Sequence, residues 1–297
     1  MDQTLLDAAL RYTRVHADAN GIAPTPIPGL TLIRQTTPTA LQYAVNKPLV
    51  ALVLQGSKRV AMGSRTFDFG AGESLLIAAN VPTVSQITRA QVSSPYISLV
   101  LDLDPAVIES LAVEMGPAPF TSDAPIRVDV TDVEVTDTAF RLLRLFDRPT
   151  AIAVLKDHLL HELHFWLLSG RHGGAIRSIG VADSHSHRIA RVVALLRTNF
   201  DKPLRVHDLA AAAGMGVSAL HEHFRAITSL TPLQFQKQLR LIEARRMMLS
   251  DGAMIADAAY TVGYESVPQF TREYGRLFGQ PPGRDMRAAK GRMQPAA

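Results

Sequence analysis

The sequence predicts an α+β protein, in which an N-terminal antiparallel β-barrel with flanking helices is followed by an all-α C-terminal domain. Three observations predict this class. Short runs of β-type residues alternate with turn residues between residues 30 and 103, helical periodicity begins at Asp104, and residues 184–297 are helical in pattern throughout. With 297 residues, of which 47% are hydrophobic, the chain can form two domains with separate cores.

The first 29 residues are expected to form a separate N-terminal segment. Met1 to Asn20 has the pattern of an amphipathic helix without the apolar run of a signal peptide, and a Pro-rich connector follows over residues 23–29. Seven β-type runs come next, at Leu30–Arg34, Leu49–Leu54, Lys58–Met62, Thr66–Phe69, Ser74–Ala78, Val84–Arg89 and Tyr96–Leu101. Their spacing predicts a small antiparallel barrel or sandwich within a domain over residues 30–170.

Three helices are expected to complete this domain, at Asp104–Met115, Asp132–Phe146 and Ala151–Ser169. The third carries a wide apolar stripe, which either packs on the barrel or is shared with a second subunit. A Gly-rich stretch without periodicity over residues 171–183 predicts a linker. The second domain is therefore expected to cover residues 184–297.

Charge differs between the two parts of the chain. Residues 1–183 hold 15 Lys and Arg against 18 Asp and Glu, whereas residues 184–297 hold 16 against 9, a net charge of +7. A basic domain can bind a polyanion, although the same charge can simply keep a domain soluble. No segment approaches the run of about 20 apolar residues that a membrane span needs. Because the sequence contains no Cys, disulfides and thiolate chemistry are excluded, and we expect a soluble protein in a reducing cytoplasm.

The C-terminal domain contains an internal duplication. The segment Asp208–Gly214 aligns with Asp257–Gly263 at an offset of 49 residues. Further apolar and Pro positions align at an offset of 50, namely Leu220 with Phe270, Phe224 with Tyr274 and Pro232 with Pro282. The second copy thus has one extra residue in its turn. Each copy has a short helix with small residues, a Gly at the turn and a second helix with an apolar inner face, which are the parts of a helix-turn-helix unit.

The second helix of each copy leaves a polar face outward. The candidate contacts to base edges and phosphates are Ser218, His221, Glu222 and Arg225 in the first copy and Ser266, Gln269, Thr271, Arg272 and Arg276 in the second. The intervening helix, Leu233–Ser250, would fix the distance between the copies. Its polar residues include Gln236, Lys237, Arg240, Glu243, Arg245 and Arg246. Helix pairs with small residues also occur in folds that never bind DNA, so one copy alone is weak evidence. Two copies within a basic domain favour DNA binding.

Residues from about Ile189 to Met286 resemble the DNA-binding domain of the AraC/XylS family of bacterial transcriptional regulators. The resemblance rests on the stretches LAAAAGMGVSALHEHFRAIT, LTPLQFQKQLRLIEARRMML and AAYTVGYESVPQFTREYGRLFGQPP. It implies that the second helix of each unit enters the major groove of double-stranded DNA. By position, this places contacts at Ser218, Ala219, His221 and Glu222 and at Pro268, Gln269, Thr271 and Arg272.

The first unit departs from the family pattern at two positions. Gly216 stands where the family usually has a helix-capping Ser, which predicts a weaker helix start. Glu222 stands where a basic residue is common, and its carboxylate would repel phosphate, although it could accept from a cytosine amino group. We therefore expect the second unit to provide the firmer DNA contacts.

Residues 30–170 resemble, more loosely, the cupin-like N-terminal domain of one subgroup of these regulators, through the stretches Leu49–Gly56, Phe67–Leu76 and Pro95–Pro105. This implies effector sensing, dimerisation or both, without naming an effector. The expected partner is double-stranded DNA; a small-molecule effector, RNA polymerase and a second copy of the chain are further candidates, whereas no cofactor, metal or membrane is expected. Strand alternation leaves open which apolar side chains face into the barrel, among Val50, Leu52, Leu54, Val60, Phe67, Leu75, Ile77, Ile97 and Leu99.

Catalytic chemistry finds little support in the sequence. Residues 30–103 contain no His, so the converging imidazoles of a metal-dependent cupin enzyme are absent. His161 and His164 are three residues apart, whereas a zinc-protease helix needs a spacing of four. No catalytic residue is therefore expected. Two alternatives remain, a metal-dependent cupin enzyme with a helical appendage and a module whose helices bind a protein partner.

Overall fold

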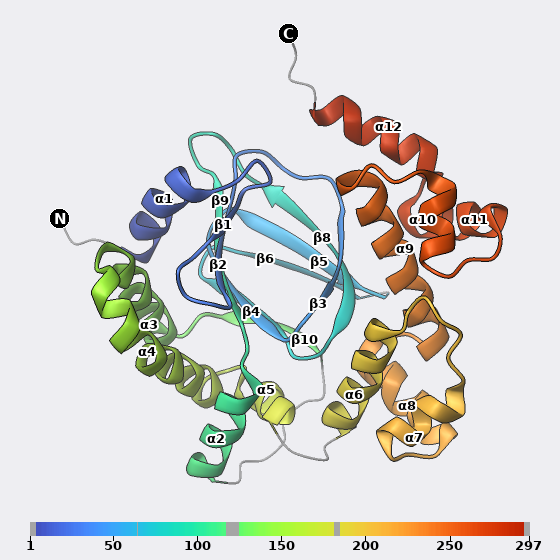
Figure 1. The fold of residues 1–297 in the computed structure, drawn as a ribbon. Coiled ribbons are helices and arrows are strands. Elements are labelled where there is room, and N and C mark those ends of the chain that lie inside the picture. Colours follow the sequence, from blue (N-terminus) through green and yellow to red (C-terminus); the bar gives the residue numbers. More distant parts are fainter. Residues whose placement is uncertain (1–3, 64, 117–124, 181–184, 294–297) are drawn as a thin grey trace. The chain divides into compact units, whose positions relative to one another are not determined.

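The computed structural model describes residues 4–63, 65–116, 125–180 and 185–293, which form two compact units (Figure 1). The first unit comprises the chain up to His187 together with Ala226–Ser229. The second comprises Arg188–Arg225 and the residues from Leu230 onward. Ser184, at which the second domain was expected to begin, lies outside the described residues.

The first unit is built on antiparallel strands that form two sheets. In the described ranges, a six-stranded sheet has the order β1-β2-β9-β4-β7-β10 and a four-stranded sheet the order β3-β8-β5-β6. The strands are β1 Ile22–Pro24, β2 Leu30–Gln35, β3 Gln42–Asn46, β4 Leu49–Gln55, β5 Ser57–Met62, β6 Arg65–Gly70, β7 Glu73–Ile77, β8 Val81–Arg89, β9 Tyr96–Asp102 and β10 Ile126–Val130. Each of the seven β-type runs of the sequence falls on one of these strands, and the expected sheet-rich domain is confirmed.

Alternation along the strands of the six-stranded sheet separates two cores. In β4, Val50 and Leu52 pack in the core that the helices share, whereas Ala51 and Val53 pack in the core between the two sheets. The open question of the barrel side chains is thereby answered. The helical side takes Val50, Leu52, Leu54, Ile97 and Leu99, and the interior takes Val60, Phe67, Leu75 and Ile77.

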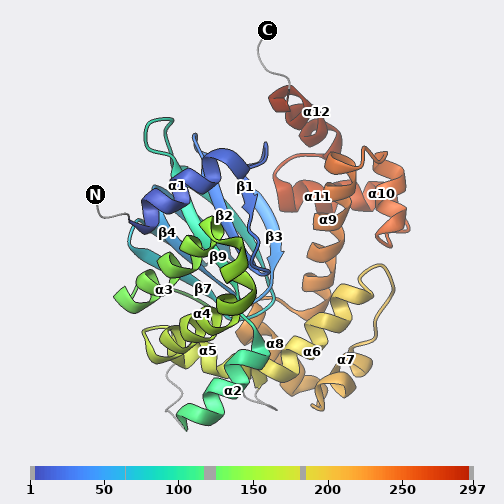
Figure 2. The same cartoon turned by 60° about the vertical axis from the view of Figure 1, so that its left-hand side comes forward.

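Helices cover the outer face of the six-stranded sheet (Figure 2). They are α1 Leu5–His16, α2 Pro105–Met115, α3 Val133–Arg144 with the 3₁₀ turn η1 Leu145–Asp147, α4 Pro149–Ser169 and α5 Gly173–Gly180. Local signals start two of them. Thr4 and Asp7 form a reciprocal capping box at α1, and the side chain of Asp104 accepts the Ala106 N–H before Pro105 at the first position of α2.

Two segments of this unit that were expected to be irregular contain regular secondary structure. Residues 173–180 of the expected linker form α5, which packs on α2 and α4 and buries Ala175 and Ile176, because burial of these apolar side chains outweighs the low helix propensity of Gly. Ala23 and Pro24, expected as the start of the connector, belong to β1, an edge strand that tolerates Pro24 at its end. Residues 181–183 of the expected linker lie outside the described residues.

The second unit is helical. It contains α6 His185–Thr198 from Arg188 onward, α7 Val206–Ala213, α8 Val217–Thr228 up to Arg225, α9 Pro232–Ser250, α10 Ile255–Thr261, α11 Val267–Phe278 and α12 Pro282–Met293. The starts of α8 and α11 are 50 residues apart and those of α7 and α10 are 49 apart, so the extra residue in the second turn is confirmed. No helix in the described part of the chain is long and apolar enough to span a membrane.

Candidate DNA-binding surface

The first helix-turn-helix unit consists of α7, a turn and α8. Gly214 ends α7 in the left-handed conformation with φ +61°, which Gly adopts without strain. The inner face of α8 is buried at Leu220, Phe224 and Ile227, and the Phe224 ring meets the Phe235 ring of α9 edge-on at 5.5 Å. The sequence therefore places α8 by its apolar positions, which leaves the opposite face outward.

The outer face of α8 carries the expected contact residues of the first unit. Ser218, His221, Glu222 and Arg225 are exposed, and Ala219 is half-buried. The carbonyl of Gly216 accepts the Leu220 N–H at 2.9 Å, so Gly216 is at the helix cap and offers no side chain to the free N–H groups of the first turn. The weaker start expected for this helix is thus visible in the structure.

The second unit consists of α10, a turn and α11, and its core is continuous with α9. Phe270 and Tyr274 of α11 are fully buried and pack with Ala258 and Ala259 of α10. Gly263 has φ +86° in the turn. Here the cap has a side chain, because the Ser266 Oγ accepts the Gln269 N–H.

The expected contact residues of α11 divide into two groups. Pro268, Arg272 and Arg276, four residues apart along the helix, are exposed. Ser266, Gln269 and Thr271 are half-buried, and two of them have partners within the unit: Ser266 caps the helix, and the Gln269 amide donates to the Glu273 carboxylate at 3.3 Å. The exposed row is therefore the part of α11 that is free to meet DNA.

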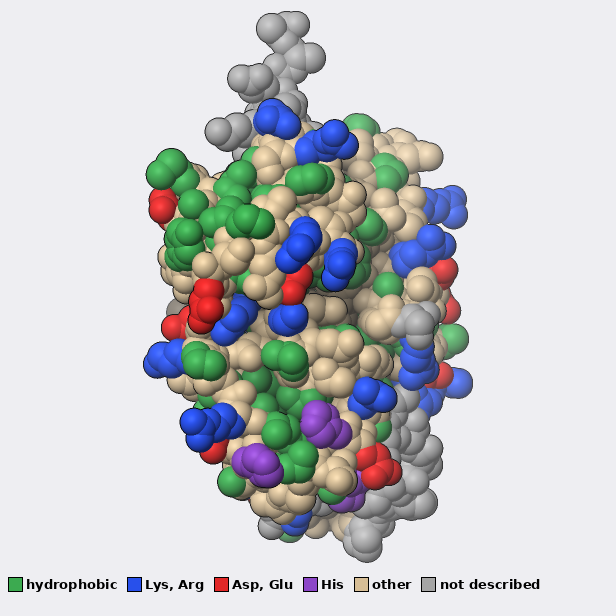
Figure 3. All heavy atoms as spheres, turned by 90° about the vertical axis from the view of Figure 1, so that its right-hand side faces the viewer, with side chains coloured by type: hydrophobic (Ala, Val, Ile, Leu, Met, Phe, Trp, Pro, Cys, Tyr) green, Lys and Arg blue, Asp and Glu red, His purple; other side chains and the backbone are tan. Residues whose placement is uncertain are grey.

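The helical compact unit, which contains both helix-turn-helix units, has an exposed face that is mixed in charge rather than uniformly basic. Figure 3 shows Lys and Arg side chains spread over this face with Asp and Glu side chains between them, and His side chains gathered at its lower end, where Figure 1 shows α7 and α8. In the described part of the chain, Arg225, Arg272 and Arg276 form no ion pair, so their charges are available to phosphates or bases.

A polar cluster joins α11 to α9, and sequence reasoning missed it. The Glu273 carboxylate accepts from Lys237 Nζ at 2.8 Å and from the Tyr264 hydroxyl at 2.8 Å. Burial raises the pKa of Glu273, but the three donors outweigh this and hold it below its ordinary value. The signal in the sequence was a Glu on the inner side of the second helix of the unit and a Lys in the N-terminal third of the preceding long helix. The cluster holds α11 from its inner side.

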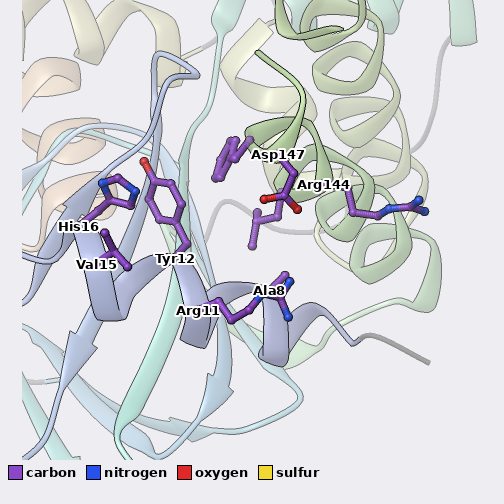
Figure 4. Close-up of a pocket in the computed structure, with 9 residues that line it drawn as sticks. Ala8, Arg11, Tyr12, Val15, His16, Arg144 and Asp147 are labelled. Atoms are coloured by element: carbon purple, nitrogen blue, oxygen red, sulfur yellow. The ribbon is translucent and has the colours of Figure 1, made fainter. Parts of the chain in front are cut away.

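The compact unit that contains the sheets has hollows on the side that its helices cover. One of about 270 Å³ lies between α1 and α3, where the Tyr12 ring stacks on His16 at 4.2 Å and its hydroxyl donates to the Pro24 carbonyl (Figure 4). Another of about 480 Å³, between α3 and α4, is lined by Arg141, Arg144, Leu145, Arg148, Leu155, His158, Leu159 and Glu162. Its ion pair joins Arg141 to Glu162.

The His residues of α4 do not gather into a metal site. His164 is buried, its Nδ1 bonds to the Leu160 carbonyl at 2.7 Å and its Nε2 accepts the Asp104 N–H at 3.1 Å, whereas His158 and His161 are exposed. Burial lowers the pKa of His164, which keeps the ring neutral in this structural role. Nowhere in the described ranges do three His, Asp or Glu side chains converge as metal ligands would.

An antiparallel sheet domain is followed in the chain by a helical domain with two helix-turn-helix units, so the protein is a helix-turn-helix protein of two domains. The sequence profile described as AraC-type transcriptional regulator N-terminus matches residues 26–175, and a helix-turn-helix domain profile matches residues 209–288. The chain belongs to the AraC-type transcriptional regulators.

Relatives agree with this assignment. The HTH-type transcriptional regulator GbdR of Pseudomonas aeruginosa is 30% identical over 108 residues, covering 36% of this chain and 29% of that protein. The transcriptional activator NphR of a Rhodococcus species is 34% identical over 104 residues, covering 34% of this chain and 31% of that protein. The matched segments thus span less than a third of these relatives.

The whole architecture has a solved counterpart. The crystal structure of unsaturated fatty acid bound wild-type ToxT from Vibrio cholerae superposes with a TM-score of 0.57 and 12% sequence identity, covering 86% of this chain and 94% of that chain. At this identity the likeness establishes the fold, an N-terminal sheet domain followed by a helical region, and nothing more specific.

Proposed function

We propose that this protein regulates transcription by binding a specific DNA duplex through α8 and α11, without catalysing a reaction. One observation carries the proposal: the same arrangement occurs twice in one unit, with a left-handed Gly turn, a buried inner face and an exposed polar outer face on the second helix. Two such helices can enter successive segments of the major groove, which admits one α-helix.

The proposed contacts are the exposed residues of both helices together with the half-buried polar and small residues beside them. They are Ser218, Ala219, His221, Glu222 and Arg225 in the first unit and Ser266, Pro268, Gln269, Thr271, Arg272 and Arg276 in the second. Arg272 and Arg276 are the strongest members because both are exposed cations on the helix that has a side-chain cap. The domain boundaries proposed are 1–29, 30–170, 171–183 and 184–297, with α5 as structured chain within the third segment.

The test begins with selection of a duplex from a random-sequence library by the full chain, followed by gel-shift titration. Arg272→Ala is expected to weaken binding to the selected duplex by about 1–3 kcal/mol. Arg246→Ala is the matched control, since Arg246 is an exposed arginine of α9 that pairs with Glu243 and Asp251. Equal affinity of wild type and Arg272→Ala would remove Arg272 from the contact set, and enrichment of no duplex would refute the function.

Salt dependence separates DNA binding from the rival interaction module. Log affinity should fall linearly with log salt concentration, with a slope of about −0.9 for each phosphate that the protein neutralises. A slope near zero for the observed partner would favour a protein ligand. Metal analysis of the purified chain addresses the remaining rival, because a metal-dependent cupin enzyme would carry a stoichiometric metal ion.

We also propose that the compact unit with the two sheets binds a small-molecule effector between those sheets. Lys58 shares the inward face of β5 with Val60 and Met62, and burial lowers the pKa of its amine to about 8. Tyr96 Oη and Ser98 Oγ are buried and find no hydrogen-bond partner among the described residues. An amphipathic anion, such as the unsaturated fatty acid that is bound to ToxT in its crystal structure, would supply the missing charge and acceptors. Calorimetric titration of oleate into wild type and Lys58→Met tests this, with binding to wild type alone as the expected result.

Dimerisation through α4 is the proposed role of its N-terminal half. Val154 is 67% exposed and Leu155 is 43% exposed, beside the hollow between α3 and α4. Light scattering of wild type and Leu155→Glu is the test, with loss of the dimer expected in the variant. We further propose a cytoplasmic location and contact with RNA polymerase, both in keeping with a DNA-binding regulator.

A further inference from the structure

The polar side chains of α9 join the two helix-turn-helix units. On the side of the first unit, Gln236 Nε2 donates to the carbonyl oxygens of Phe200 at 3.1 Å and Lys202 at 2.6 Å. These carbonyls lie in the loop that follows α6 and leads to α7. Gln236 is 5% exposed, so its amide is held within the body of the unit.

Arg240, one helical turn further along α9, bonds to both units at once. Its Nε donates to the Phe200 carbonyl at 2.6 Å, and its Nη2 donates to the carbonyls of Asp201 at 3.1 Å and Lys202 at 3.3 Å. Its Nη1 donates to the Gly263 carbonyl at 2.8 Å, in the turn that leads to α11. The rigid fork of a guanidinium fixes the directions of all these donors, which a flexible ammonium cannot do.

The two segments that Arg240 joins also meet each other directly. Gly263 has φ +86°, and a Cβ at this position would overlap the Asp201 carbonyl oxygen. The turn of the second unit therefore packs against the loop of the first without room for a side chain. The Arg240 guanidinium lies over the neighbouring Tyr264 ring at 5.9 Å from its centroid, which places the cation beside the same turn.

We propose that Arg240 is a positioning residue that fixes the offset between α8 and α11 and thereby sets the spacing between the two DNA segments that the protein accepts. This inference rests on the proposed function. One extra base pair moves a segment by about 3.4 Å and rotates it by about a tenth of a turn, so a rigid pair of helices discriminates against it. Without the guanidinium, four carbonyls lose their common donor, and the two units can shift relative to each other.

The experiment uses the full chain and the duplex that wild type selects from a random-sequence library. Three derivatives are compared with this duplex by gel shift: one with a base pair inserted between the two segments, one with a base pair deleted there, and one that keeps only the segment read by α11. Wild type is expected to prefer the native spacing by about tenfold or more. Arg240→Ala is expected to reduce this preference below about threefold while it keeps its affinity for the single segment, and Arg240→Lys should fall between the two.

The outcomes separate positioning from general stability. Arg246→Ala is the control, because it removes an arginine of the same helix that bonds within α9 and to Asp251, and it should keep the tenfold preference. Equal loss of affinity for all four duplexes in Arg240→Ala, or an unchanged spacing preference, would overturn the inference, although a selected duplex would still support the function. If Arg240→Ala does not fold, Gln236→Leu, which removes only the bonds to Phe200 and Lys202, is judged by the same two criteria.

Discussion

Asp285 is the side chain on which the second helix-turn-helix unit should depend most for stability. It lies in α12 with 3% of its side chain exposed and accepts from Arg245 Nε at 2.7 Å, the Tyr274 hydroxyl at 2.7 Å and Gln280 Nε2 at 3.0 Å. Burial raises the pKa of Asp285, but these donors outweigh it and hold the pKa below its ordinary value. The carboxylate thus joins α9, α11 and α12 in its charged form.

Asp285→Asn should destabilise this unit by about 3 kcal/mol. Removal of one partner from a buried ion pair costs about 3–5 kcal/mol, and the lower end applies because the Arg245 side chain keeps 20% exposure and can be hydrated. Because the folded-state pKa of Asp285 is depressed, its contribution is complete above the unfolded-state pKa near 3.9 and disappears as the pH falls through the folded-state value. The stability difference between wild type and Asp285→Asn should therefore persist at pH 7 and narrow below about pH 4.

Urea denaturation can resolve this effect by unit. The single Trp of the chain, Trp166, lies in α4, so its fluorescence reports the unfolding of the compact unit that contains the sheets. Circular dichroism at 222 nm also reports the unfolding of the helical compact unit. Asp251→Asn is the control, since this carboxylate is 53% exposed beside Arg246 and should contribute less than about 1 kcal/mol. A cost of Asp285→Asn as small as that of Asp251→Asn, or an equal shift of the Trp166 transition, would refute the reasoning.

Three further expectations concern the caps, the turn and the buried His residues. Gly216→Ser should stabilise α8 by a few tenths of a kcal/mol, because an added Cβ meets no atom within 4 Å and the hydroxyl supplies a cap. Ser266→Ala should destabilise α11 by about 1 kcal/mol, because it removes the existing cap. Both changes in stability are measured by circular dichroism in urea, and a destabilised Gly216→Ser would contradict the cap assignment. Gly263→Ala should cost more than about 2 kcal/mol in the same assay, since a positive φ and the overlap with the Asp201 carbonyl add, and a neutral result would count against the packing of that turn. Burial lowers the pKa of both His164 and His172, so below the unfolded-state His pKa of about 6.5 the unfolded chain binds more protons than the folded chain. The urea midpoint followed by Trp166 fluorescence should therefore fall as the pH is lowered from 6.5. The fall should be smaller when both His residues are replaced by Gln.

The strands that the sequence pattern did not reveal all lie at sheet edges, although the edge strand β6 was found. β1, β3 and β10 were missed, and each is at the edge of its sheet. An edge strand pairs on one side only and buries little, as β3 shows by having no buried residue, so apolar alternation is weak there. The interior strands, which pack apolar side chains in one core or in both, carried a pattern strong enough to be found with bounds within three residues.

The candidate site was predictable for its outer face and not for its support. Periodicity identified Phe270 and Tyr274 as inward and Arg272 and Arg276 as outward, because a helix with one buried face must repeat every three to four residues. Gln236 and Arg240 were seen as polar residues of a long helix, but their acceptors are backbone carbonyls more than 20 residues away. Any residue has a carbonyl, so no sequence pattern marks such a partner.

The support and the outer face of α11 use separate residues, and this separation bears on how the helix can read DNA. Its inner anchors are Glu273, bonded to Lys237 and Tyr264, and Tyr274, bonded to Asp285. The exposed residues Pro268, Arg272 and Arg276 form none of these bonds, so DNA contact requires no anchor to break. A helix held in this way does not need to be ordered on binding, so the conformational entropy that α11 still loses is that of its contacting side chains, Arg272 and Arg276 among them.

α8, in contrast, follows Gly216, a cap residue without a side chain, so more of the stability of this helix must come from packing. Its exposed face carries Glu222, whose charge makes that face less attractive to phosphate. The two units of one duplicated pattern are therefore expected to contribute unequally, with the larger part of sequence discrimination in α11.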